Sequence, residues 1–149
     1  MILAPHMLAG AALATSIHQP ILLAFSAMGL HYLLDVLPHW EYEFLTARKK
    51  SIYKIVLDIG AGLAILFFVI QRAGPTEQLL MLWGGFFGIV PDGFSAIYFF
   101  SQGKYFRRQM RFHTFWHWLI VPEKTHPPRW LGLATEALVV AVSLFLLLR

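Results

Sequence analysis

The sequence has no cysteine and little charge. The absence of cysteine from all 149 residues excludes disulfides, thiolate metal sites and a cysteine nucleophile. Charged residues make up 13% of the chain and hydrophobic residues 58%, whereas soluble domains average about 25% charged residues. The net charge of +4 is too small to interpret globally, and no nucleic-acid partner is expected. This composition predicts an integral membrane protein, with membrane lipids as its partners.

Several familiar motifs are also missing. The chain contains no His-Glu-x-x-His protease motif, no phosphate-binding glycine loop and no nucleophile elbow. It shows no internal repeat and no low-complexity segment. The first 16 residues lack a positively charged start, so we expect a retained first helix rather than a cleaved signal peptide.

The apolar segments predict one all-α domain over residues 1–149, a polytopic transmembrane bundle of about five to six helices. The first segment is shorter than the roughly 20 residues that a full span needs, and Pro91 is expected to break the fourth. The expected helices cover residues 3–16, 21–37, 51–71, 79–100, 112–121 and 131–148.

Basic residues orient this bundle. One group lies before the third expected helix and another follows the fourth, so both fall on the same side of the membrane. By the positive-inside rule this side is cytoplasmic, in a prokaryotic inner membrane. The two groups are Arg48, Lys49, Lys50 and Lys54, and Lys104, Arg107, Arg108 and Arg111.

The three aspartates of the chain, Asp35, Asp58 and Asp92, all lie within apolar segments. Each carboxylate costs about 2.5–3.5 kcal/mol near the bilayer centre, so something must compensate for them. The rise per residue of a helix places them at one depth together with four histidines. Aspartate and histidine together are typical ligands of a divalent metal. The four histidines are His6, His31, His113 and His117.

Spacing supports the metal hypothesis. His31 and Asp35 are four residues apart, as are His113 and His117, so each pair shares one helix face. Either pair alone is also typical of buried histidines with ordinary hydrogen bonds. Seven candidate ligands exceed the three of a single catalytic zinc and favour a two-metal centre with ions about 3.5–4 Å apart. Zinc is the expected ion, with manganese and iron as alternatives because they share these ligands.

Other residues are candidates for catalysis or substrate binding. Asp58 and Glu136 are the candidate catalytic groups, although Asp58 has an alternative partner in Lys54, and Glu136 an alternative role as a snorkelling acid. Asp92 is alternatively a solvated carboxylate at a kink. His39 is a candidate contact to a lipid headgroup or substrate. The candidate phosphate-binding residues, alternatively only a topology signal, are Arg107, Arg108 and Arg111.

The chain resembles small bacterial and archaeal membrane proteins grouped as membrane-bound metal-dependent hydrolases. The resemblance rests on the segments His6-Met-Leu-Ala-Gly, His31-Tyr-Leu-Leu-Asp35-Val-Leu-Pro38-His39, Pro91-Asp92 and His113 to His117. The His-x-x-x-Asp element is also similar to half of the ligand set of zinc-dependent phospholipase C. The chain lacks the His-Arg-Gly-x-Thr-His-Ser segment of the family's better-known branch. The resemblance implies metal ligation by His6, His31, Asp35, Asp92, His113 and His117.

These observations predict a membrane-embedded metal hydrolase that faces the cytoplasm and cleaves a lipid or other phosphoester. Three alternatives stay open. Intramembrane aspartate and histidine also mark transport routes and proton relays. His31 and His117 are the axial ligands expected of a haem protein. The polar residues are alternatively contacts that hold helices together.

Overall fold

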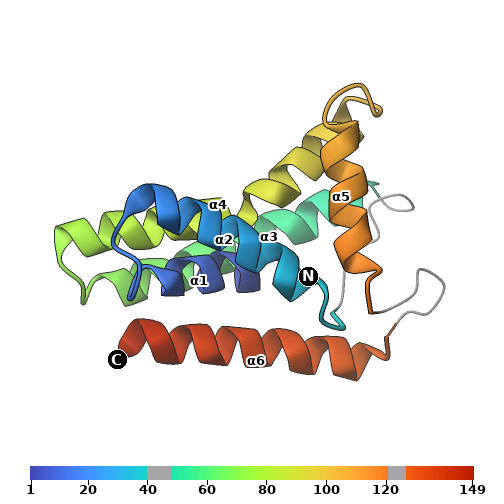
Figure 1. The fold of residues 1–149 in the computed structure, drawn as a ribbon. Coiled ribbons are helices and arrows are strands. Elements are labelled where there is room, and N and C mark those ends of the chain that lie inside the picture. The colour runs from blue at the N-terminus through green and yellow to red at the C-terminus, as the bar shows by residue number, and fades with distance from the viewer. Residues whose placement is uncertain (40–47, 121–126) are drawn as a thin grey trace.

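The computed structural model describes residues 1–39, 48–120 and 127–149, and for residues 48–51 the backbone alone. Every regular element in these ranges is a helix (Figure 1). Within α3, α4 and α6 lie segments long and apolar enough to cross a membrane, which confirms the predicted all-α transmembrane bundle. The six helices are α1 (Leu3–Leu13), α2 (Pro20–Asp35), α3 (Arg48–Ile70), α4 (Pro75–Phe100), α5 (Arg107–His117) and α6 (Arg129–Leu148).

Helix α1 lies at the centre of the bundle. It contacts α2, α3, α4 and α6, and each residue from Ala4 to Ala12 is buried. Figure 1 shows it between α2 and α6. Its 11 residues extend over about 16 Å, far less than the roughly 30 Å of a hydrocarbon core. It is therefore an enclosed helix rather than a membrane span.

Glycine contacts set the position of α1 against α4. A Cβ added to Gly10 would collide with the carbonyl group of Gly84, and one added to Gly88 would lie 3.2 Å from the carbonyl carbon of His6. Small residues allow such close backbone approach between membrane helices. The result is that the backbone of His6 rests directly on α4.

Helix α4 differs from its prediction at both its start and its middle. It begins at Pro75 rather than residue 79, because Glu77 accepts a hydrogen bond from the N–H of Gly74 at 3.2 Å and proline suits the first helical position. It continues through Pro91. The predicted break is thus a bend, visible in Figure 1 where the yellow part of α4 rises away from the green part.

Helix α5 begins earlier than predicted, at Arg107 rather than residue 112. The preceding residue, Phe106, has a left-handed backbone with φ of 58°, which reverses the chain after α4. Three arginines then occupy the first five positions of the helix, where positive charge opposes the helix dipole. This unfavourable charge placement is why the sequence pattern indicated a later start.

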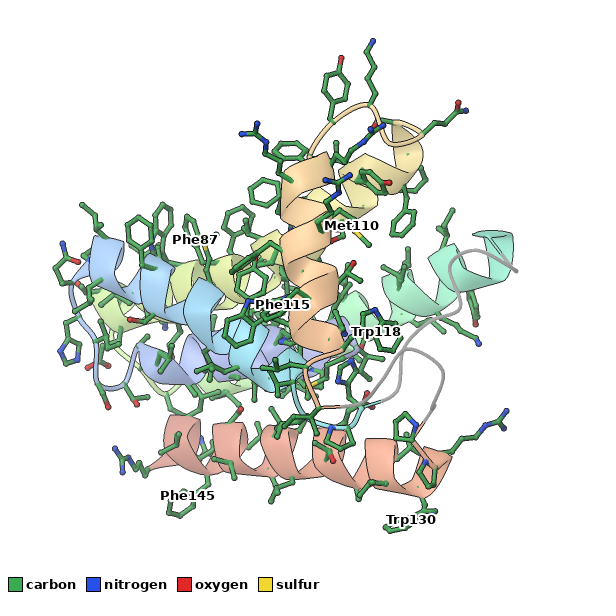
Figure 2. The ribbon with its side chains drawn as sticks, turned by 45° about the vertical axis from the view of Figure 1, so that its right-hand side comes forward. Phe87, Met110, Phe115, Trp118, Trp130 and Phe145 are labelled. Carbon is green, nitrogen blue, oxygen red and sulfur yellow. The ribbon has the colours of Figure 1, made fainter. Side chains whose placement is uncertain are left out.

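The outer surface of the bundle is apolar. Phe68 is 74% exposed, Trp130 70% and Phe145 68%, and Figure 2 shows Trp130 and Phe145 pointing away from α6. A surface of large exposed hydrophobic side chains is what a lipid-facing bundle requires.

Most helices meet the candidate site at one end of the bundle. The start of α1, the end of α2 and the start of α3 lie on one side in Figure 1, together with α5 and the start of α6. The two predicted basic segments lie at this same end, as expected from consecutive crossings by α3 and α4. Which side of a membrane this end faces stays a prediction.

The contact between Gly10 and Gly84 is testable by alanine substitution. Gly10→Ala should lower the thermal stability of the detergent-purified protein, with a cost of about 1–3 kcal/mol or more, since overpacking forces the backbones apart. Gly29→Ala is the matched control, because an added Cβ there meets nothing within 4 Å. Equal melting temperatures for the two variants would contradict the close α1–α4 contact.

Candidate metal centre

Asp35, the last residue of α2, is the hub of the site. It is 1% exposed, and its two carboxylate oxygens face different groups. Oδ1 lies 3.1 Å from the amino nitrogen of Met1 and 3.0 Å from Nε2 of His6. Met1 lies just before α1 and His6 lies within it, and the glycine contacts fix the position of α1 along α4. One carboxylate oxygen thus ties α2 to α1.

The second oxygen of Asp35 is surrounded by three imidazoles. Oδ2 lies 2.8 Å from Nε2 of His113, 3.1 Å from that of His31 and 3.3 Å from that of His117. Nε2 of His113 lies 3.2 Å from Nε2 of His31 and 3.1 Å from Nε2 of His117. The i, i+4 spacing predicted from the sequence therefore presents each pair to one point.

The hydrogen bonds of His31 identify which of its nitrogens carries the proton. Nδ1 lies 2.8 Å from the carbonyl oxygen of Gly88. A carbonyl only accepts, so Nδ1–H donates, and the neutral ring keeps its lone pair on Nε2. This arrangement, with one ring nitrogen donating to a backbone carbonyl, is typical of metal-binding histidines.

The same logic applies to His113. Its Nδ1 lies 2.7 Å from Oγ of Ser95, and Ser95 donates its own hydroxyl proton to the carbonyl of Pro91 at 3.2 Å. Since the serine proton is directed to Pro91, the serine oxygen accepts from Nδ1–H of His113. The lone pair of neutral His113 is consequently on Nε2, facing Asp35 and His31.

The convergence of lone pairs could hold a cation. Two neutral imidazoles whose Nε2 atoms are 3.2 Å apart cannot hydrogen bond through those atoms, and the adjacent carboxylate oxygen is a further acceptor. A tetrahedral zinc with bonds of 2.0–2.1 Å holds its ligand atoms about 3.3 Å apart. The separations of 2.8–3.3 Å found here fit such an ion.

One side of the cluster is open. The side chains of Asp92 and His117 are 25% and 16% exposed, whereas those of His6 and His31 are fully buried. Oδ1 of Asp92 lies 3.6 Å from Nε2 of His113 and 3.9 Å from that of His31. Catalytic metal sites keep an accessible position, whereas structural ones are closed. This geometry is that of an accessible site.

The structure brings together six of the seven predicted ligands. They fall into three groups whose ligand atoms lie within 4.8 Å of one another, and neighbouring groups share His31 or Asp35. The groups are His6, His31 and Asp92; His31, Asp35 and His113; and Asp35, His39 and His117.

His39 belongs to the third group, although its expected role was a headgroup or substrate contact. Its Nδ1 donates to the carbonyl of Leu37 at 2.6 Å, which leaves the lone pair on Nε2. The available signal was spacing, since His39 follows Asp35 by four residues just as Asp35 follows His31. Pro38 concealed this signal, because a proline indicates the end of a helix.

Asp58 lies outside all three groups. Its Oδ2 accepts hydrogen bonds from the N–H groups of Leu3 at 2.6 Å and Ala4 at 3.2 Å. The first amides of a helix have no partner within the helix, so a carboxylate from α3 caps α1 and favours its dipole. These two contacts of Asp58 are those of a helix cap, and its predicted role as a ligand or catalytic group stays a prediction.

The remaining predicted site residues are not members of these groups. Glu136 is buried in α6 and is 4% exposed, but it belongs to none of the three groups. The three candidate phosphate-binding arginines are exposed and lie in the first five positions of α5: Arg107, Arg108 and Arg111.

Comparison with known proteins gives one partial match. The chain is 38% identical over 82 residues to a probable threonine/serine transporter, YbxG, of Bacillus subtilis (strain 168). The match covers 54% of this chain but 17% of the transporter, so the chain spans less than a fifth of that protein's length. No family model and no solved structure matches. The resemblance to metal-dependent hydrolases therefore stays a prediction.

Substitution of Asp58 separates capping from ligation. Asp58→Ala should lower stability by about 0.5–2 kcal/mol, as loss of a cap does, with the metal content of the purified protein unchanged. Asp58→Asn, which keeps an acceptor oxygen, should recover much of the stability. Loss of metal from a stable Asp58→Asn protein would place Asp58 among the ligands instead.

Proposed function

We propose that this protein is a membrane-embedded, metal-dependent hydrolase whose Asp35-centred cluster holds divalent ions, with zinc expected and manganese or iron as alternatives. The observation that carries the proposal is the convergence of imidazole lone pairs on one buried carboxylate. Nε2 atoms of His31, His113 and His117 lie within 3.3 Å of Oδ2 of Asp35. Protonation of all three rings cannot satisfy this arrangement, because His113 is 3.1–3.2 Å from both of the others.

The overlap of the three groups supports a centre for two ions. His31, Asp35 and His113 would hold one ion, with His117 beside them. The flanking groups add His6 and Asp92 on one side and His39 on the other. A carboxylate shared between neighbouring groups, as Asp35 is here, is a common bridge in two-metal sites.

The cluster suits hydrolysis of a phosphoester. When bound, a divalent ion would act as a Lewis acid that lowers the pKa of a coordinated water to about 7. Asp92 lies on the open side within 3.9 Å of two ring nitrogens, where its carboxylate can orient a water and hold a proton. The buried His6 and α1 exclude solvent from behind. Lipid phosphoesters are the proposed substrate class, because the cluster lies in a bundle with a lipid-facing surface.

The proposed location is the cytoplasmic side of a prokaryotic inner membrane. Support comes from basic residues of α5 and of the segment before it, which lie at the site's end of the bundle. Positive charge of this kind favours the cytoplasmic side.

Transport is a second candidate function, and the similarity to a probable threonine/serine transporter supports it where no comparison supports hydrolysis. A transport route needs polar groups through the thickness of the membrane. Behind the cluster, the core is apolar among the described residues, with Leu8, Leu23 and Leu66 at most 1% exposed. This apolar core favours a site open at one end.

The central experiment is metal analysis of detergent-purified protein, followed by a panel of phosphoester substrates with and without chelator. The wild type should carry stoichiometric metal and lose turnover with chelator. In the Asp35→Asn and His117→Gln variants the metal content should fall at least about tenfold and turnover should be lost, since each substitution removes a ligand. The control is His18→Gln, because His18 is exposed and outside the cluster.

The same preparation distinguishes the two functions. Proteoliposomes that take up radiolabelled threonine, serine or metal ions, without hydrolysing any ester, would establish transport and overturn the hydrolase proposal. Stoichiometric metal in stable Asp35→Asn protein would overturn the metal centre itself.

The hydroxyl of Ser95 should set the metal affinity through His113. Ser95→Ala removes the acceptor for Nδ1–H, and loss of such a partner typically weakens metal binding about 10–100-fold. Ser143→Ala is a matched control, because Ser143 is also buried and donates to the carbonyl four residues earlier, that of Val139. Metal affinity measured by competition with a chelator should fall for the first variant alone; equal affinities would contradict the role of Ser95.

A further inference from the structure

A second polar feature of α5 is separate from the metal centre. An open pocket of about 510 Å³ lies where α5 meets the end of α4, within the roughly 300–1,000 Å³ typical of ligand pockets. Figure 2 shows Met110, one of its lining residues, on the opposite side of α5 from Phe115. The lining residues are Tyr98, Arg107, Met110, Arg111 and Thr114.

The charge of this pocket is positive and unbalanced. Arg107 and Arg111 are four residues apart, so both guanidinium groups are on one helix face. Neither forms an ion pair with a carboxylate in the part of the chain that the structure describes. The sequence between Asp92 and Glu123 contains no acidic residue at all. The pocket therefore suits an anion, and paired guanidinium groups match the geometry of a phosphate.

The surroundings of the pocket are those of a membrane interface. Tyr105 and Phe106, the two residues before Arg107, are 54% and 44% exposed. Exposed aromatic side chains beside arginines are typical of the layer where lipid headgroups meet acyl chains. A ligand at this place would bring an anionic head to the arginines and an apolar tail to the aromatic rings.

The pocket lies on a different face of α5 from the candidate ligand His113. Arg107 and Arg111 are six and two residues from His113, which places them about 120° and about 160° away from it around the helix axis. A phosphate held by the arginines is consequently not at the metal centre. Occupation of the pocket requires neither a bound ion nor catalysis.

We propose that Arg107 and Arg111 bind the phosphate of an anionic membrane lipid, with its acyl chains along the exposed rings of Tyr105 and Phe106 just before α5. Within the proposed function, such a site holds a lipid beside the cluster without taking part in bond cleavage. It distinguishes these two arginines from Arg108, which is exposed but does not line the pocket.

The test is a binding titration of detergent-purified full chain with short-chain phosphatidylglycerol. Diacylglycerol with the same acyl chains provides the probe without phosphate, and glycerol phosphate provides phosphate without acyl chains. Wild-type protein should bind phosphatidylglycerol at least about tenfold more tightly than either, because charge-assisted contacts and tail burial both contribute.

Variants locate the site. The double variant Arg107→Gln/Arg111→Gln should bind phosphatidylglycerol at least about tenfold more weakly, as loss of two charge-assisted contacts predicts. Arg108→Gln, which removes one charge from the same turn of the helix, should bind as the wild type does. The metal content and melting temperature of all variants should stay unchanged, so this proposal and that of the metal centre fail separately.

Three results would overturn the proposal. Equal weakening by Arg108→Gln would show a diffuse charge effect rather than a site. Equal affinity for diacylglycerol would exclude the phosphate, and equal affinity for glycerol phosphate would assign the pocket to a soluble phosphate compound instead of a lipid.

Discussion

The burial of the Asp35 carboxylate is the constraint on which the structure depends. A carboxylate that is 1% exposed in a membrane bundle requires compensation. Nitrogen atoms of Met1, His6, His31, His113 and His117 surround its two oxygens within 3.3 Å, and the Met1 ammonium together with the proposed divalent ion would supply the compensating positive charge. Since these groups belong to α1, α2 and α5 or precede α1, the fold and the site are the same set of contacts.

The packing of small residues allows α1 to take part in these contacts. Backbone contact between α1 and α4 at Gly10, Gly84 and Gly88 allows an 11-residue helix to lie inside the bundle. A short enclosed helix has a polar start at membrane depth, which is costly unless its amides are capped. Asp58 provides this cap from α3. The backbone amides of Leu3 and Ala4 thus help to compensate the Asp58 carboxylate.

Hydrogen bonds to groups behind the histidines determine which ring nitrogens carry the lone pairs. The carbonyl of Gly88 and the hydroxyl of Ser95 hold the Nδ1 protons of His31 and His113, and this directs both Nε2 lone pairs to Asp35. α4 contributes these contacts from within its bent region, next to Pro91. Proposals about function rest on this donor set, because the match to a probable threonine/serine transporter covers only 17% of that protein. The exposed side of the cluster at Asp92 favours the proposed hydrolysis, whereas the similarity to a transporter favours transport.

Composition, hydropathy and helical spacing determined from the sequence the all-α membrane fold, the approximate helices and the six residues that cluster. These features depend on which residues follow one another along the chain. The contacts of Asp58 with α1, and the place of His39 beside Asp35 and His117, were decided by tertiary structure. The amides of Leu3 and Ala4 are 55 and 54 residues from Asp58, and no local pattern records such a contact. The protonated nitrogen of His31 likewise depends on a backbone carbonyl 57 residues away, and since every residue has such a carbonyl, only three-dimensional packing shows which one is used.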